Sequence, residues 1–294
     1  MGCTLGRLLA DAGQEIVCVV SRTAASARKG GRFLSCRNVA TSLEAIPRGV
    51  NLVFVATPHA AIGEVSRGLA GLDHLPFNAI SVCHTSGIHT AEALEAVGGR
   101  GATVFSFHPL QTFPRDFSPR QILPSARGIV YGVDGPPAGV RRARALARLL
   151  GGRIVVIPAD LRVFYHAACV VASNHLTALL WVLERMTGRL GESRGSFSSL
   201  FSPIISATLA NAVRTSPAAS LSGPVSRGGV ETVAMHFVAL EKAAPDLLPY
   251  FAAMTRETVK LARAKGSIDE RAERALMDTI ERSTMRIPAQ GRTP

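Results

Sequence analysis

The stretch MGCTLGRLLADAGQEIVCVVSRT, residues 1–23, decides the fold of this chain. Apolar residues at helical spacing follow Gly2 and end at Gly13, and the run 15–20 has the β-branched composition of a strand. A short polar segment, 21–23, ends that strand. The order predicts the helix, turn and second strand of a βαβ unit, whose first strand is not in the sequence.

The position of Gly2 relates this unit to dinucleotide-binding proteins. Their fingerprint, G-x-G-x-x-G, follows a buried strand and opens a helix, so that backbone N–H groups at the helix N-terminus hold a pyrophosphate. Gly2 fits the third glycine, and the two earlier ones would lie upstream of Met1. We expect a cofactor domain without its front edge, with low stability and weak NADPH binding if the chain begins at Met1. An ordinary surface helix packed on another sheet is the alternative.

Strands alternate with helices through the first half of the chain. The run 51–58 is continuously apolar and ends in a polar turn, as expected of a strand buried on both faces. Further strands are expected at 79–83, 102–107, 127–133 and 153–157, with helices at 42–45, 59–69, 89–97 and 138–150 and a loop at 28–32. The alternation predicts a doubly wound parallel α/β sheet over residues 1–158. Together with the position of Gly2 and with Arg22 after the second strand, it is interpreted as a Rossmann-like NADP-binding domain.

The pattern changes near residue 158 and does not change back. Apolar residues recur at helical spacing over 160–190, 200–214, 230–243, 244–265 and 268–283, with almost no strand-like run. Residues 287–294 have the composition of a frayed tail. We therefore expect an all-helical second domain, residues 159–294.

Composition restricts the class of protein. A hydrophobic content of 47% with 18% charged residues is typical of a packed globular chain and excludes disorder. The formal net charge of +12 is spread over scattered arginines without interleaved aromatic residues. A phosphate-bearing cofactor and an acidic small-molecule substrate account for part of this charge, so no nucleic-acid partner is expected.

Cysteine usage and hydropathy bear on location. The five cysteines are scattered, odd in number and without C-x-x-C spacing. This pattern is typical of reduced thiols and predicts neither a disulfide framework nor a metal site. We identify no apolar run long enough to span a bilayer and no secretion signal. These features predict a cytoplasmic protein with no membrane partner and no metal.

Polar residues follow several of the expected strands. In an open parallel sheet the ligand lies outside the carboxyl ends of the strands, so these residues are candidates for cofactor binding. Ser21 and Arg22 stand where a carboxylate would select NAD, and a guanidinium there favours the 2′-phosphate of NADP(H). The cofactor-binding candidates are Gly2, Ser21, Arg22, Thr23, Ala56, Thr57, Pro58, His84 and Ser86.

Two histidines, His84 and His108, each follow an apolar strand. A histidine can donate a proton to a carbonyl oxygen as hydride arrives, because its usual pKa is near neutral pH. The alternative for each is a hydrogen-bonded histidine in a turn. We take His108 as the catalytic candidate.

Further polar residues interrupt the apolar second half. His166, Ser173 and Asn174 are spaced to share one face of a helix, which is either a polar network in a bundle or the substrate side of a cleft. His166 and Asn174 are further catalytic candidates, with Ser173 expected to bind substrate. In a later loop, Ser222, Gly223 and Arg227 are expected to bind substrate, with Arg227 suited to bind a carboxylate, although an ordinary loop is the alternative.

Five motifs, in this order and spacing, resemble a known family. That family is the Rossmann-like proteins with a C-terminal DUF2520 domain, a branch of the 6-phosphogluconate-dehydrogenase-like superfamily akin to ketopantoate and pyrroline-5-carboxylate reductases. The resemblance covers essentially the whole chain, although the complete glycine motif of the family is absent. The motifs are His84-Thr85-Ser86-Gly87, Phe107-His108-Pro109-Leu110-Gln111-Thr112, Tyr165-His166-Ala167-Ala168, Ala172-Ser173-Asn174 and Leu221-Ser222-Gly223-Pro224.

The resemblance implies an NADP-dependent oxidoreductase that forms a homodimer through its helical domain, with an active site between its domains. Our leading hypothesis is reduction of a small 2-oxo acid, ketopantoate-like, with His108 as proton donor, Asn174 and His166 orienting the substrate and Arg227 pairing with its carboxylate. The alternatives are an imine reductase or prephenate-type dehydrogenase of the same superfamily, and a non-catalytic dinucleotide-binding or regulatory protein.

Overall fold

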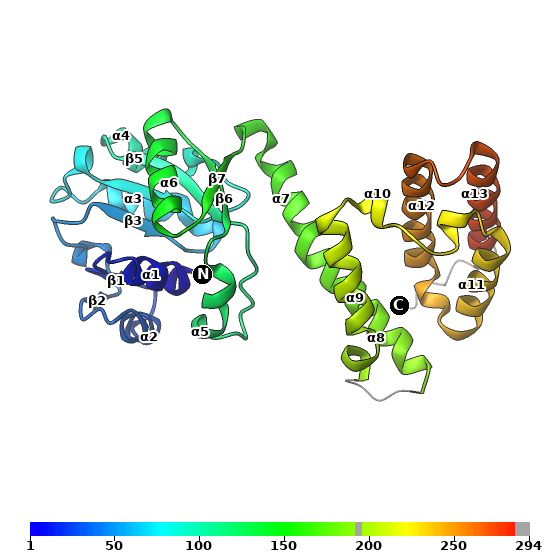
Figure 1. The fold of residues 1–294 in the computed structure, drawn as a ribbon. Helices are drawn as coiled ribbons and strands as arrows, with labels where there is room; N and C mark the ends of the chain where they lie inside the picture. Colours follow the sequence, from blue (N-terminus) through cyan, green and yellow to red (C-terminus); the bar gives the residue numbers. More distant parts are fainter. Residues whose placement is uncertain (192–195, 286–294) are drawn as a thin grey trace, which may run out of the picture. The chain divides into compact units, whose positions relative to one another are not determined.

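A computed structural model describes residues 1–191 and 196–285 and divides the chain into two compact units (Figure 1). The first unit is Met1–His175, and the second begins at Leu176. Strands end at Val156, close to the boundary at 158 that the sequence predicts, but the next helix still belongs to the first unit. Each unit is described separately below.

The centre of the first unit is a five-stranded sheet of order β3-β4-β5-β6-β7. Strands β3, β4 and β5 are parallel to one another, β6 is antiparallel to β5, and β7 is parallel to β6. The doubly wound α/β prediction is therefore confirmed, with one antiparallel pair that the sequence pattern does not reveal. The strands are β3 (Leu52–Val55), β4 (Ser81–His84), β5 (Thr103–Pro109), β6 (Val130–Asp134) and β7 (Arg153–Val156).

Helices cover both faces of this sheet (Figure 1). Successive residues of a strand point to opposite sides, so the apolar side chains on both faces need a layer to pack against. Phe105 and Phe107 pack with helices α1 and α6 in one buried cluster, whereas Val82 packs with α3 and α4 in another. The helices of the unit are α1 (Gly2–Asp11), α2 (Ala24–Leu34), α3 (Ile62–Ala70), α4 (Glu95–Gly99), α5 (Pro119–Ile122), α6 (Pro137–Leu149) and α7 (Arg162–Val170). Short 3-10 turns are η1 (Leu43–Ala45), η2 (His59–Ala61), η3 (Phe77–Ala79), η4 (Ala91–Leu94), η5 (Leu123–Ala126) and η6 (Ala159–Leu161).

A separate two-stranded parallel sheet joins β1 (Val19–Val20) to β2 (Val39–Ala40). The strand expected at 15–20 is thus limited to its last two residues, because β2 is its single partner among the described residues and pairs only there. Backbone hydrogen bonds across strands, more than composition, decide how far a strand extends.

The loop expected at 28–32 is wrong, since these residues lie inside helix α2. The glycines that suggested a loop instead permit close packing. A Cβ on Gly30 would lie 3.1 Å from Val19 Cγ1, and one on Gly31 would lie 2.8 Å from the carbonyl oxygen of Cys36. Tertiary packing of α2 against β1 and β2 therefore outweighs the low helix propensity of glycine.

Every described element of the second unit is helical, as the sequence predicts. Its buried core joins α11, α12 and α13 through side chains such as Phe237, Val259 and Leu276. The tail expected at 287–294 lies outside the described residues. The helices are α8 (Leu176–Arg189), α9 (Ser196–Arg214), α10 (Pro217–Ser220), α11 (Val230–Ala243), α12 (Leu248–Lys265) and α13 (Glu270–Met285), with 3-10 turns η8 (Val225–Arg227) and η9 (Pro245–Leu247).

One continuous helical stretch, Ala159–Arg189, is long and apolar enough to cross a membrane by length and composition. The expectation that no segment meets this criterion is therefore wrong. The stretch has 31 residues, a mean hydropathy of 1.4 in its most apolar window, and only 6% of that window buried. Such a helix is weak evidence for a membrane span, but its exposed apolar surface needs an explanation.

We expect Gly31→Ala to lower the free energy of unfolding by about 1–3 kcal/mol, because the added methyl collides with backbone and with Val39. Urea denaturation of the full chain measures this change. Gly49→Ala is the matched control, since nothing lies within 4 Å of a Cβ there. Equal unfolding midpoints for Gly31→Ala and the unmodified chain would contradict the packing role given to Gly31.

Candidate functional site

Polar side chains gather where strands β3, β4 and β5 end. These strands are neighbours and parallel, so their carboxyl ends meet at one edge of the sheet. His59 follows β3, Ser86 follows β4, and His108 lies near the end of β5. Nδ1 of His59 is 2.7 Å from Oγ of Ser86, so loops from different strands are joined directly. We call His59, Ser86, His108, Arg162, Tyr165 and His166 the polar cluster.

His84 lies beneath this cluster and is completely buried. The backbone N–H of Ser86 donates to its Nδ1, and its Nε2 is 2.8 Å from the carbonyl oxygen of Thr90. Burial lowers the pKa of His84 to about 4, so its ring is neutral at neutral pH. Both ring nitrogens of His84 are hydrogen-bonded to the backbone of the turn that follows β4. The expected role of His84 in cofactor binding stays a prediction.

His108 and Tyr165 form the central contact of the cluster. Nδ1 of His108 is 2.9 Å from the phenolic oxygen of Tyr165. The tyrosine ring reaches this position because Gly132, paired with His108 across β5 and β6, has no side chain. A Cβ there would lie 2.6 Å from Cζ of Tyr165. Glycine at position 132 thus makes the space in which Tyr165 reaches the histidine.

His166 covers the cluster from the same helix. It lies one residue after Tyr165, and a Cβ on Gly87 would be 2.6 Å from His166 Cδ2 and 2.8 Å from His108 Nε2. The ring centroid of His166 is 6.3 Å from the centroids of both His59 and His108. In the part of the chain that the structure describes, no three His, Cys, Asp or Glu side chains are arranged as metal ligands.

The charge state of the cluster follows from its burial. Burial, with smaller contributions from the positive charge of Arg162 and from the neighbouring His166, lowers the pKa of His108 to about 4. The pKa of His59 is lowered mainly by burial, with contributions from His89 and His166. Burial raises the pKa of the Tyr165 hydroxyl well above its usual range. At neutral pH His108 and Tyr165 are therefore neutral partners that can exchange a hydrogen bond.

Arg162, the first residue of α7, is the largest fully buried side chain, with 1% of its surface exposed. Its Nη2 donates to the carbonyl oxygen of Ser86 at 2.8 Å, and its guanidinium carbon is 5.4 Å from the centroid of the Tyr165 ring. Nε and Nη1 are buried without a hydrogen-bond partner among the described residues. Burial lowers the pKa of Arg162, with partial compensation by Asp134.

The predicted polar face of the long helix is interrupted by a π-helical turn, η7 (Val171–His175). Ser173 lies in this turn, where its Oγ donates to the carbonyl oxygen of Cys169 at 2.8 Å and lies 2.9 Å from Oδ1 of Asn174. Asn174 is exposed. A π turn changes the helical register, so spacing along an ideal helix does not apply across it. The structure joins His166 to the cluster, and the roles of Ser173 and Asn174 stay predictions.

The predicted cofactor positions of the first unit lie on α1 and on two strand ends. A Cβ on Gly2 would be 3.0 Å from Cβ of Ala56, so α1 and the segment after β3 approach closely. Thr57 and Pro58 follow and are exposed. Ser21, Arg22 and Thr23 link β1 to α2, and Thr23 caps α2 by accepting from the N–H of Ser26 at 3.3 Å.

The predicted carboxylate-binding loop belongs to the second unit. Ser222 and Arg227 are exposed there, and Gly223 has a φ of 95°, which favours glycine. Their predicted contacts with substrate stay predictions. In the first unit the structure provides a different cation, Arg162, next to His108.

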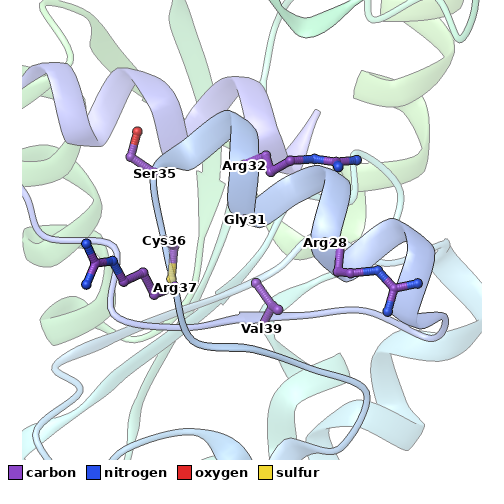
Figure 2. A pocket seen from close by; sticks show the side chains of 7 residues that line it. All are labelled: Arg28, Gly31, Arg32, Ser35, Cys36, Arg37 and Val39. Atoms are coloured by element: carbon purple, nitrogen blue, oxygen red, sulfur yellow. The ribbon is translucent and has the colours of Figure 1, made fainter.

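A surface pocket of about 430 Å³ lies between α2 and β2 (Figure 2). Its charged lining consists of Arg28, Arg32 and Arg37, but the Arg37 side chain points away from the other two. A second pocket of about 330 Å³ is lined by the first turn of α2 and by residues 39–42. Neither pocket shares a lining residue with the polar cluster.

Sequence patterns missed part of the cluster. The sequence predicts His59 only as the start of a helix. It places Arg162 near the start of another helix and gives no signal for a function of this side chain. Gly87 and Gly132 carry no local signal for their function of making space. Position at a strand end could have identified His59, because it follows Ala56–Pro58 directly.

Two family models match the sequence of this chain. A Rossmann-like domain matches residues 1–109, and the domain of unknown function DUF2520 matches residues 129–258. This chain joins a Rossmann-like domain to a DUF2520 domain. The resemblance inferred from the five motifs is thereby confirmed. The DUF2520 match begins before β6, so it includes Gly132 and Tyr165, whereas His108 belongs to the Rossmann-like match.

Solved structures share the fold of this Rossmann-like and DUF2520 chain. Protein TM1727 from Thermotoga maritima has a TM-score of 0.67 and 25% identity, covering 89% of this chain and 94% of that one. BF3122 from Bacteroides fragilis, described as a candidate NADP oxidoreductase, has a TM-score of 0.65, 21% identity and coverages of 90% and 93%. Plasmodium falciparum pyrroline carboxylate reductase, solved with NADP bound, has a TM-score of 0.58, 14% identity and 94% coverage of both chains. No curated protein sequence matches significantly.

We expect the stability of the chain to fall as pH falls from 6.5 towards 4. The folded pKa of His84 lies below its ordinary value of 6.5, so in this window the unfolded chain binds a proton that the folded chain does not. The full shift corresponds to about 3 kcal/mol, and His108 contributes in the same direction. Urea denaturation at several pH values measures the slope.

His84→Gln removes one titrating group, so its stability should depend less steeply on pH than that of the unmodified chain. His236→Gln, a change at an exposed histidine of α11, serves as the control and should keep the original slope. An unchanged slope in His84→Gln would contradict the buried neutral state assigned to His84.

Proposed function

We propose that this chain is an NADPH-dependent oxidoreductase that reduces the carbonyl group of a small 2-oxo acid, ketopantoate-like, by hydride transfer. The observation that carries the proposal is the contact between His108 and Tyr165 at the carboxyl ends of the parallel strands, the edge where ligands bind in such sheets. The fold neighbours support dependence on a nicotinamide dinucleotide, since one is solved with NADP bound.

The residues of the first unit fit a dinucleotide phosphate at the start of α1. No side chain caps this helix, and the Oγ1 of Thr4 in its first turn is buried without a hydrogen-bond partner among the described residues. An unpaired hydroxyl and free helix N–H groups suit a phosphate oxygen. Gly2 and Thr4 would hold the pyrophosphate, with Ser21, Arg22 and Thr23 toward the adenosine 2′-phosphate. Bound NADPH would supply the hydride.

His108 would supply the proton. With the Tyr165 hydroxyl donating to Nδ1, the proton of His108 is on Nε2, which points toward the backbone at Gly87. During reduction His108 would give its Nε2 proton to the substrate carbonyl oxygen, while its Nδ1 would receive the proton of the Tyr165 hydroxyl. Solvent then returns a proton to the tyrosine. The lowered pKa of His108 fits a neutral donor that acts through this relay.

We expect His108→Ala to reduce kcat about 100-fold or more, because removal of a positioned proton donor typically has this effect. The assay follows NADPH consumption by the full chain with a panel of 2-oxo acids, ketopantoate first, and with a cyclic imine as a separate arm. His74→Gln is the control, since His74 precedes β4 at the opposite edge of the sheet.

Turnover confined to the imine would favour imine reduction. NADPH binding without turnover of any substrate would favour a non-catalytic dinucleotide-binding protein, and either result would reject 2-oxo acid reduction. Full activity in His108→Ala would reject the role given to His108. An NADH arm in the same assay tests the expected preference for NADPH.

We further propose that the chain is a cytoplasmic homodimer formed through its helical part. The described part of α9 has no buried residue from 199 onward, and large apolar side chains on it are exposed, namely Leu200, Ile204, Leu209 and Val213. The helix Ala159–Arg189 exposes Phe164 and Trp181 in the same way. A second copy would cover these exposed apolar side chains.

We expect the double variant Ile204→Asp, Val213→Asp to weaken self-association at least about tenfold, because a charge buried in an apolar interface is unfavourable. Sedimentation equilibrium of the full chain measures the association. Lys242→Asp, at an exposed charged position of α11, is the control. A monomer at all concentrations would reject the dimer, and extraction only with detergent would point to a membrane instead.

A further inference from the structure

Arg162 has a buried charge that the described protein leaves largely unpaired. The side chain is 1% exposed, one guanidinium nitrogen donates to the carbonyl oxygen of Ser86, and Nε and Nη1 have no acceptor among the described residues. Burying an ion without partners is strongly unfavourable, so proteins rarely retain such a group without a function. An acceptor that the described residues do not supply is therefore expected at this position.

Nearby acidic groups do not provide these acceptors. Among the described residues no carboxylate forms an ion pair with Arg162. Asp134 attracts it electrostatically, but both carboxylate oxygens of Asp134 accept from the N–H of Ala91, at 3.1 and 3.3 Å. Tyr165, whose ring lies near the guanidinium, has a neutral hydroxyl because burial raises its pKa. The positive charge of Arg162 thus remains unpaired within the polar cluster among the described residues.

We propose that Arg162 is the residue that binds the carboxylate of the substrate in this site. The proposal rests on the proposed reduction of a 2-oxo acid and deepens it by naming the group that recognises the acid. The guanidinium donors match carboxylate oxygens in charge and geometry. Arg162 takes the role that the sequence gave to Arg227, and it does so within the same unit as His108.

The first turns of α7 give this assignment its geometry. Tyr165 follows Arg162 by three residues and His166 by four, so all three share one side of the helix. The Tyr165 ring is 5.4 Å from the guanidinium carbon and 5.7 Å from the centroid of the His108 ring. A carboxylate on Arg162 brings the adjacent carbonyl of a 2-oxo acid towards His108. Because Nε and Nη1 are closed to solvent, binding of a carboxylate requires a neighbouring side chain to shift. His166, four residues later on the same side of α7 and only half-buried, is the side chain that we expect to shift.

The test measures binding of oxamate, an unreactive analogue of 2-oxo acids, to the full chain by calorimetry and by the shift in unfolding temperature. Arg162→Met should bind oxamate about tenfold to 100-fold more weakly, as expected for loss of a charged hydrogen-bonding partner. Without oxamate, its unfolding temperature should be equal to or higher than that of the unmodified chain, because an unpaired buried charge has been removed. Arg141→Met, at an exposed position on α6, is the matched control and should retain affinity.

Each other outcome counts against the proposal. Equal oxamate affinity in Arg162→Met and the unmodified chain, or no binding by the unmodified chain, would overturn it. A large loss of stability in Arg162→Met would assign the guanidinium a structural role. A separate arm with inorganic pyrophosphate tests the cofactor: if Arg162→Met loses pyrophosphate but not oxamate, Arg162 serves the cofactor. The assay requires no turnover, so oxamate binding that depends on Arg162 stands even where NADPH-dependent reduction fails.

Discussion

The packing of α7 against the end of the sheet is the constraint on which the site depends. Its first residue reaches the carbonyl of Ser86 after β4, and its fourth reaches His108 on β5. The contact with His108 requires close approach of the Tyr165 ring, which the missing side chain of Gly132 permits. One helix thereby holds the loops of neighbouring strands in a fixed arrangement, although the residues that it joins are up to 76 positions apart in the chain.

Desolvation connects the histidines of this arrangement. His84 and His108 are neutral at neutral pH mainly because they are buried, and the charge of Arg162 acts in the same direction on both. A neutral imidazole donates from one nitrogen and accepts at the other, so its function depends on which partner fixes the tautomer. The backbone fixes His84 and leaves it no free nitrogen, whereas Tyr165 engages one nitrogen of His108 and leaves the other available. Two histidines that look equivalent in sequence therefore differ in what they can do.

The second unit has a different relation to solvent. Its three-helix core of α11, α12 and α13 buries its apolar side chains, whereas α9 exposes most of its own. Much of the helix Ala159–Arg189, which begins in the first unit, is likewise exposed. In the proposed homodimer, assembly in addition to folding would determine where this apolar surface goes. Mean hydropathy alone does not decide whether this helix spans a membrane. The helix Ala159–Arg189 meets the membrane criterion by length and composition, but it carries the buried Arg162 near one end.

The sequence by itself determined the fold class, the all-helical second half and the two-domain family, because strand and helix periodicities and short motifs are local properties of the chain. It also gave His108 and His166 as candidate site residues, and the structure brings these two side chains together. Only the tertiary structure decided that α2 is a helix. Its glycines permit close packing against Val19 and Val39, which lie outside the segment, and this packing stabilises the helix. The same holds for Arg162 and Tyr165: burial and a partner 57 residues away exist only after the strands are ordered and β6 runs antiparallel to β5, which no local pattern encodes.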